Sequence, residues 1–398
     1  MCVSSGKMLA LGAFVVLTAS CGNSDDGDGP NREQVVANYA EIVQLNYQQT
    51  LAAAEAMKAA IDRFVSDPTP ASHEVAKRAW LDARVPYGQT EAFRFYGGPI
   101  DDANGPEGAL NSWPLDEAYV DYVDGAADAG IVNDPSIAIT RENLVDLNAG
   151  GMGDITGIGN SFDGDKAISV GYHAVEFLLW GQDRDPNGPG SRPYTDFLTT
   201  QEATAPNGDR RGLYLQVAAA LIVDDLQYLV DQWAPDGAYR SAFIALPVDE
   251  ALTKMLTGAG ILSKGELAAE RMDVALETLD QEDEQSCFSD NTHTDLMMDA
   301  LGIQNVWLGN YGWHDGPGID ELVGALDPEA AARTDAAIRA SIEAIAAIPS
   351  PFDRAISSSG SPGWNAVDTA VDRLFDQAGE IVAAGTVLGL SVGVELPE

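Results

Sequence analysis

Basic residues are scarce in this sequence. Its 398 residues include 22 Lys and Arg against 62 Asp and Glu, so the formal net charge at pH 7 is −40. No cluster of basic residues interrupts this acidic excess, and such a cluster is the electrostatic footprint of a protein that binds nucleic acid. The sequence therefore argues against nucleic acid as a partner. The acidity keeps the chain soluble and attracts cations without specifying a function.

No apolar run is long enough to cross a membrane at the start of the chain, where one would serve as an anchor. Residues 1–20 carry Lys7 and then the apolar run Met8–Leu17. That run is too short for a bilayer and indicates a secretory signal peptide. Because Lys7 is the only charged residue in it, removal of residues 1–20 changes the net charge from −40 to −41.

Cysteine is nearly absent, and one of the three cysteines ends this leader. The segment Leu17–Cys21 resembles a bacterial lipobox, in which the cysteine becomes the lipidated first residue, although Thr18 stands where leucine is usual. We expect Cys21 to carry lipid and residues 21–31 to form a flexible tether. The alternative is a plain secreted protein cut near Ala19. Only Cys287 then remains in the folded part, which excludes an internal disulfide.

Alternation of apolar and polar residues, the pattern of β-strands, is almost absent. Apolar residues recur at helical spacing instead, which predicts an all-α protein. The two parts of the chain repeat a similar plan, which predicts two tandem helical-bundle halves, residues 32–205 and 206–398. The expected helices are 32–65, 73–95 (with Ser72 as its N-cap), 140–147, 209–233, 238–257 (interrupted by Pro247), 260–283, 294–309, 328–347 and 364–386.

Histidine occurs only four times, and one copy lies in a strongly apolar segment, Gly171–Gly181. His173 and Glu176 are three residues apart, so on a helix they share one face, with Cβ atoms about 5–6 Å apart. Together they offer half of a metal site. The alternative is a core histidine satisfied by Glu176. The preceding segment 150–164 is rich in glycine but lacks the Lys-Ser/Thr ending of a phosphate loop, which argues against a nucleotide site.

Two further features stand out as candidates. Arg84 and Glu91 lie seven residues apart on the apolar face of an expected helix, where charged residues need partners. The alternative to a site role is a surface position or an ion pair. The segment Ser286–His293 is dense in donors and acceptors; the alternative reading is an acidic helix end with an N-cap at Asp290 or Asn291. Its cysteine lies between acidic residues that disfavour the thiolate, so it is not a candidate nucleophile.

The sequence Gly171–Gly181 resembles the GxHxxE signature of the imelysin family, also known as peptidase family M75. Further matches run in order along the chain, and Ser286–His293 resembles the subgroup called iron-regulated protein A. Together these similarities extend from about residue 35 to residue 390. The other matching segments are Trp80–Arg84, Tyr87–Arg94, Gly98–Asp101 and Arg192–Tyr194.

The resemblance implies two helical-bundle halves with a site between them near the HxxE pair. It also implies exported or lipid-anchored envelope proteins linked to iron uptake. The family is named for insulin-cleaving metallopeptidases, yet a zinc hydrolase usually has three protein ligands and a separate general base. This chain has neither HExxH nor HxxEH. Hard cations such as ferric iron or calcium prefer the oxygen ligands that abound here. The chemistry favours binding over hydrolysis.

The leading hypothesis is an exported protein, lipid-anchored in the cell envelope at the outer membrane or facing the periplasm. It would bind iron, or a small iron-loaded ligand, and act with an envelope transporter or a redox partner. Zinc and calcium are the alternative metals, and the lipid is the expected contact with the membrane. Four residues are expected to be metal ligands and three to support them: His173, Glu176, Glu91 and Asp101, then Arg84, Asp290 and His293.

Two other classes of function stay open. In a metallopeptidase, Glu176 would activate a metal-bound water. In a metal-free binding module for a peptide, haem or envelope partner, His173 would be structural. The site between the halves carries its own geometric expectation: Asp290 or His293 should lie within roughly 10 Å, between Cα atoms, of His173 or Glu176.

Overall fold

The computed structural model describes residues 30–148 and 166–396. The expected signal peptide, Cys21, nearly all of the tether and the whole of segment 150–164 lie outside these residues. Helices dominate the described part, and its two strands are a two-residue antiparallel pair, β1 (Asn310–Tyr311) and β2 (His314–Asp315). The all-α prediction is confirmed.

A first group of four helices packs together: α1 (Arg32–Ser66), α2 (Pro70–Gly88), α6 (Gly171–Trp180) and α7 (Gly208–Trp233). α1 begins with a capping box at Asn31, and its apolar face is buried along almost its whole length. α7 is long and apolar enough to cross a membrane by length and composition, but here it packs along α1 and α6 as a core helix.

A second group is built around one long helix. α9 (Val248–Ile261) continues through η5 (Leu262–Asp273), which has π-helical hydrogen bonding, into α10 (Val274–Thr278). This long helix packs with α15, which in turn packs on α13, while α11 contacts both η5 and α13. π-helical turns are rare and recur at functional sites. The remaining long helices of the group are α11 (Thr292–Leu308), α13 (Pro328–Ala346) and α15 (Pro362–Val387).

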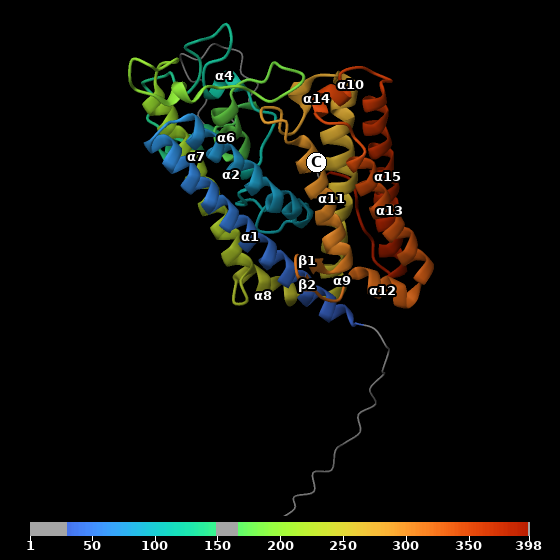
Figure 1. The fold of residues 1–398 in the computed structure, drawn as a ribbon. Helices are drawn as coiled ribbons and strands as arrows, with labels where there is room; N and C mark the ends of the chain where they lie inside the picture. The colour runs from blue at the N-terminus through green and yellow to red at the C-terminus, as the bar shows by residue number, and fades with distance from the viewer. Residues whose placement is uncertain (1–29, 149–165, 397–398) are drawn as a thin grey trace, which may run out of the picture.

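The two groups lie side by side (Figure 1) and meet mainly through α11, which packs against α2 and η1 (Gln89–Phe93). The division of the chain after residue 205 remains a prediction; α7, which follows it, packs on α1 and α6. Short elements connect the long helices: α3 (Glu107–Leu110), α4 (Glu117–Val120), α5 (Arg141–Leu147), η4 (Tyr194–Phe197), α8 (Ala238–Ile244), η6 (Gln281–Asp283), α12 (Ile319–Leu326) and α14 (Phe352–Ile356).

Most predicted helices are present, but several boundaries were wrong. The expected helix 73–95 runs from Pro70 to Gly88, and Glu91 lies in η1, which follows it. The N-cap of α2 is Thr69, not Ser72: the Thr69 hydroxyl accepts the Ser72 N–H, and the Ser72 hydroxyl accepts the Thr69 N–H. The expected break between 257 and 260 does not exist. The interruption expected at Pro247 is present: α8 ends at Ile244, and the helix that starts at Val248 runs on to Thr278.

Candidate functional site

The helix α6 is buried along its whole length and forms the centre of the site. It begins at Gly171, whose φ is +88°. A Cβ there would lie 2.7 Å from the Leu110 carbonyl oxygen and 2.8 Å from that of Ala109, so only glycine fits. The first glycine of GxHxxE is therefore needed because α6 starts against the backbone of α3.

Distant side chains also hold the carbonyl groups of α6. Trp80 Nε1 donates to the Tyr172 carbonyl at 2.9 Å, and His73 Nε2 bonds the Leu179 carbonyl at 2.9 Å. The Leu179 carbonyl belongs to the last turn, where helices leave carbonyl groups without internal partners. These contacts fix the rotation and the axial position of α6, and with them the direction of its polar side chains.

The predicted pair is formed within this helix. His173 Nδ1 lies 2.9 Å from Glu176 Oε2, and the two side chains are 2% and 0% exposed. The other ring nitrogen, Nε2, is buried and has no hydrogen-bond partner. Burial and the positive charge of Arg84 lower the pKa of His173 to about 3, so the imidazole is neutral at physiological pH.

Glu176 is held from the other helix group by Ser289. Its Oε1 accepts the Ser289 backbone N–H at 2.9 Å and the Ser289 hydroxyl at 2.6 Å. Burial raises the pKa of Glu176 to about 8, although both hydrogen bonds from Ser289 lower it. The segment Ser286–His293 therefore lies against α6, as its expected position across the interface requires.

The supporting residues expected in that segment take different places. Asp290 follows Ser289, close enough for its charge to act on Glu176, but its carboxylate makes no hydrogen bond to the HxxE pair. His293 turns away: its Nε2 contacts the Ile348 carbonyl at 3.2 Å, and its ring packs edge-on against Phe352. The direct contact is made by Ser289, which the sequence did not single out.

Arg84 crosses the interface to a partner that the sequence analysis did not name. Its Nε donates to Asp295 Oδ1 at 2.9 Å, and its Nη1 donates to Asn111 Oδ1 at 2.6 Å. The guanidinium also lies over the rings of Tyr87 and Tyr172, each 5.2 Å from the ring centroid. The side chains of Arg84 and Asp295 are both buried, with 1% and 0% of their surface exposed. Arg84 is thus paired with a carboxylate of α11, and its supporting role at a metal site remains a prediction.

Glu91 forms a second buried ion pair across the interface, in which the acidic residue lies in the first helix group and the basic residue, Arg271, in the second. Its Oε2 accepts Arg94 Nη1 and Arg271 Nη2, both at 2.6 Å. Arg271, on η5, also donates to Asp299 of α11 and lies 3.1 Å from Glu266. Burial raises the pKa of Glu91, but the guanidinium groups of Arg94 and Arg271 lower it to about 2. Oε1 of Glu91 has only a long contact with an amide nitrogen, at 3.4 Å.

Asp101, the fourth expected ligand, is engaged in its own loop. One carboxylate oxygen accepts the Phe95 backbone N–H and the other accepts the Gly98 N–H, the latter at 2.8 Å. Burial raises the pKa of this carboxyl group, and the same backbone bonds lower it. The structure therefore brings Glu91 into the charged interface with His173 and Glu176 and uses Asp101 to hold the turn at Gly97–Gly98.

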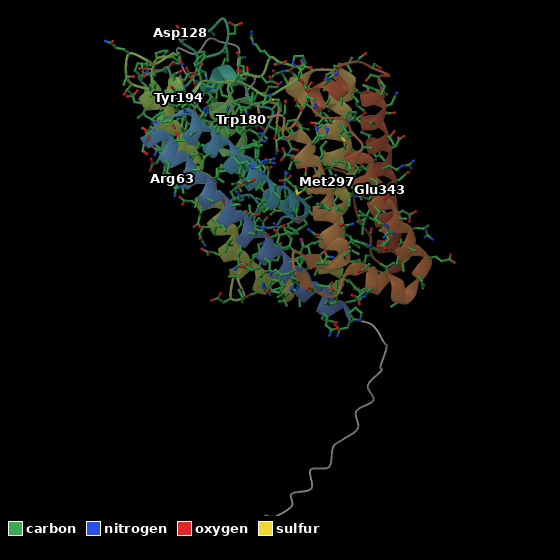
Figure 2. The ribbon with its side chains drawn as sticks, viewed as in Figure 1. Arg63, Asp128, Trp180, Tyr194, Met297 and Glu343 are labelled. Atoms are coloured by element: carbon green, nitrogen blue, oxygen red, sulfur yellow. The ribbon has the colours of Figure 1, made fainter. Side chains whose placement is uncertain are left out.

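We call eight of these residues the interface cluster. The cluster contains the HxxE pair and two buried ion pairs that cross the contact between the two helix groups with opposite polarity. Figure 2 shows side chains filling that contact, with Trp180 of α6 and Met297 of α11 labelled. A surface cavity of about 290 Å³ lies beside it, lined in part by Arg94, Glu107, Asn111 and Arg271. The members are Arg84, Glu91, His173, Glu176, Arg271, Ser289, Asp295 and Asp299.

Four members of the interface cluster were missed as site residues. The charged pair Asp295 and Asp299 is four residues apart in an apolar helix, which is the same signal that drew attention to Arg84 and Glu91. Arg271 pairs with Glu91 and Asp299, which are 180 and 28 positions away along the chain. Nothing local marks Ser289, because its role depends on a contact 113 residues away along the chain.

Helices that bring distant charged residues to one buried histidine–carboxylate pair define an all-α protein with a preorganised polar site. The imelysin family model, peptidase family M75, matches residues 43–381, and the chain belongs to this family.

Similar proteins agree with this assignment. The chain is 26% identical over 332 residues to "Iron-regulated protein A" of Synechococcus elongatus, covering 80% of this chain and 76% of the relative. A crystal structure of an iron-regulated protein A precursor from Parabacteroides distasonis has a TM-score of 0.66 at 20% identity, covering 92% of this chain and 98% of that one. An imelysin-like protein from Psychrobacter arcticum has a TM-score of 0.60 at 12% identity, with 92% and 99% coverage. Both solved structures support the fold.

Proposed function

We propose that this protein binds iron, as an ion or within a small iron-loaded ligand, at the interface cluster. It does so as an exported protein of the cell envelope during iron acquisition. The observation that carries the proposal is the buried Nε2 atom of His173, which has no hydrogen-bond partner. A buried polar atom without a partner is costly, and a ligand that satisfies it recovers that cost.

The arrangement around the imidazole suits a metal. Glu176 lies at Nδ1; in its ionised form, which a bound cation would favour although burial raises its pKa to about 8, it accepts Nδ1–H and leaves the Nε2 lone pair free. A carboxylate that accepts the outer N–H of an imidazole orients the ring and raises its basicity toward a metal. On this geometry His173 is the metal ligand and Glu176 its positioning partner, which refines the hypothesis that both are ligands.

Other oxygen atoms of the cluster lack close partners, although they and His173 do not form a group of ligand atoms within 4.8 Å of one another, which favours an iron-loaded ligand over the bare ion. Asp299 Oδ1 is buried without a partner, and Glu91 Oε1 has only its long amide contact. The electrostatic surroundings of His173 contain both signs of charge. Asp295 and Glu91 raise its pKa, and Arg84 and Arg271 lower it. A cation held by an anionic chelate would complement both signs of charge, which supports an iron-loaded ligand beside the free ion.

The relatives support the biological setting of the proposal. One curated relative is named for iron regulation, and the solved structure from Parabacteroides distasonis is named as a precursor, as an exported protein would be. The leader at residues 1–20 and the lipobox-like Leu17–Cys21 agree with export and lipid anchoring. A transporter or redox partner in the envelope would then receive or deliver the iron.

Iron titration of the purified protein, in ferrous and ferric form, tests the proposal. His173→Ala should lower iron affinity at least tenfold. The matched control is His314→Ala, because His314 Nε2 already bonds Asn38 on another surface of the molecule and should not affect binding. Equal iron affinity in both variants and in the parent protein would exclude the interface cluster as the binding site.

A further inference from the structure

A second group of carboxylates lies apart from the interface cluster. Oxygen atoms of Asp183, Asp290 and Asp353 all lie within 4.8 Å of one another. Asp183 follows the end of α6, Asp290 belongs to the segment that contacts Glu176, and Asp353 lies in the first turn of α14. Three segments distant in the sequence therefore converge on one point. We call these three residues the aspartate triad.

Each member of the triad presents an oxygen that has no hydrogen-bond donor. Asp183 Oδ1 accepts the Asp185 N–H at 3.0 Å, and Asp353 Oδ1 accepts the Arg354 N–H at 2.5 Å. Their second oxygens, and Oδ1 of Asp290, are buried and have no partner. Asp183 and Asp353 are 3% and 4% exposed, so water does not satisfy these atoms as it would on an open surface.

A fourth acidic side chain, Glu284, interacts electrostatically with the triad. Glu284 is 1% exposed, and apart from the nearby Thr292 hydroxyl neither of its oxygens has a hydrogen-bond donor. Burial raises its pKa, and so do the charges of Asp353 and Asp290, which places its carboxyl group beside the triad. Among the described residues, no Lys or Arg forms an ion pair with Glu284 or with any member of the triad.

We propose that the aspartate triad is a binding site for a hard divalent cation, with calcium as the best fit. Calcium takes carboxylate oxygens at about 2.3–2.6 Å, so oxygens on opposite sides of one ion can be up to about 5 Å apart. The spacing in the triad satisfies this limit. The site contains no nitrogen or sulfur donor that would favour a softer metal. Asp290, which is only half-buried, gives the ion a path from solvent.

The position of the triad gives the cation a structural role that does not require iron to be bound. It would link the chain after α6 to α14 and to the segment before α11. Because Ser289 and Asp290 are adjacent, an ion on Asp290 would also hold Ser289 in place against Glu176. Asp290 therefore supports the interface cluster through the backbone and not as a ligand of the iron. Calcium sites of extracellular modules have dissociation constants of about 10⁻⁴–10⁻³ M, the range expected here.

Thermal unfolding of the full-length protein, with chelator and with millimolar calcium, tests this site. Calcium should raise the unfolding temperature of the parent protein, and Asp183→Asn or Asp353→Asn should abolish that increase. The matched control is Asp128→Asn, an exposed aspartate at the same end of the molecule (Figure 2), which should keep the full increase. In chelator the two triad variants should unfold at or above the parent temperature, since each removes a buried like charge.

Calorimetric titration with calcium supplies the second readout. Calcium affinity should fall at least tenfold in both triad variants and stay unchanged in His173→Ala, which separates this site from the iron site. The absence of any calcium effect on the parent protein would overturn the proposal. So would an equal calcium effect in the parent protein, the triad variants and the Asp128→Asn control.

Discussion

Ser289 donates two hydrogen bonds to one oxygen of Glu176, from its backbone N–H at 2.9 Å and from its hydroxyl at 2.6 Å. The two residues are 113 positions apart and belong to different helix groups. The other oxygen of Glu176 is bound to His173 Nδ1. The contact between the groups therefore determines how the imidazole is oriented, and its Nε2 atom is presented only when the groups are docked.

This relationship makes Ser289→Ala an informative change. Loss of a buried hydroxyl that donates to a carboxylate should lower the free energy of unfolding by about 1–3 kcal/mol. It should also lower iron affinity, because Glu176 and the His173 ring lose part of their orientation. Urea unfolding and iron titration measure the two effects. Ser341→Ala is the control: its hydroxyl bonds the Arg373 carbonyl at 3.0 Å within the second group, so it should change stability alone.

The ion pair of Arg84 with Asp295 should be essential for folding. Replacement of Arg84 by Met leaves a fully buried carboxylate without its cation, which typically costs 3–5 kcal/mol, so a loss of about that size in unfolding free energy is expected. Arg78→Met on the same helix is the control, since Arg78 and Asp82 are 73% and 58% exposed and should contribute little. Similar stability losses in the two variants would show that the buried pair carries no special weight.

Gly171 should tolerate no side chain. Gly171→Ala combines a φ of +88° with a Cβ that would lie 2.7 Å from the Leu110 carbonyl oxygen, and it should destabilise the protein by well over about 1 kcal/mol. Gly379→Ala is the opposite case, because Gly379 lies inside α15 with open space around its Cβ position. That change should stabilise the protein by about 0.5–1 kcal/mol. Chemical denaturation measures the unfolding free energy of both variants. A change of the same sign in Gly171→Ala and Gly379→Ala would contradict this account.

His73 should make the protein less stable in mild acid. Burial and the charge of Lys77 lower its pKa to about 4, whereas an unfolded histidine has a pKa of about 6.5. Between these values the unfolded chain binds a proton that the folded chain does not. Stability is therefore fully present above about pH 6.5 and is lost as the pH falls toward 4, by up to about 3 kcal/mol.

The variant His73→Phe isolates this contribution. Phe keeps the stacking on Phe64, whose ring centroid is 4.6 Å away, but it cannot titrate or bond the Leu179 carbonyl. We expect a lower free energy of unfolding at neutral pH and a smaller change between pH 6.5 and 4. Unfolding curves measured across that interval would oppose the assignment if the parent protein and the variant had the same pH dependence.

The sequence was sufficient for features that depend on local pattern. Helical periodicity located α1, α7, α13 and α15 to within a few residues, and the spacing of His173 and Glu176 gave the buried pair. The density of polar groups in Ser286–His293 marked a segment that does lie against α6. These features follow from neighbours within one or two helical turns, where spacing alone fixes geometry.

The rest depends on partners that spacing cannot reveal. Arg84 and Glu91 were recognised as residues that need partners, but the partners, Asp295 and Arg271, are 211 and 180 positions away. Asp101 was expected to reach the metal, yet backbone N–H groups of its own turn take both oxygens, as short acidic side chains commonly do. The aspartate triad has no local signature at all, because its members come from three separate segments.

The central claim is that His173 Nε2 binds iron, and X-ray absorption at the iron edge of the iron-loaded protein tests it most directly. An imidazole ligand adds outer-shell scattering from its ring atoms, which carboxylate oxygens do not produce. We predict this imidazole signal in the parent protein and in His314→Ala, and its loss in His173→Gln. An iron spectrum without imidazole scattering in the parent protein, or one that is unchanged in His173→Gln, would contradict the account.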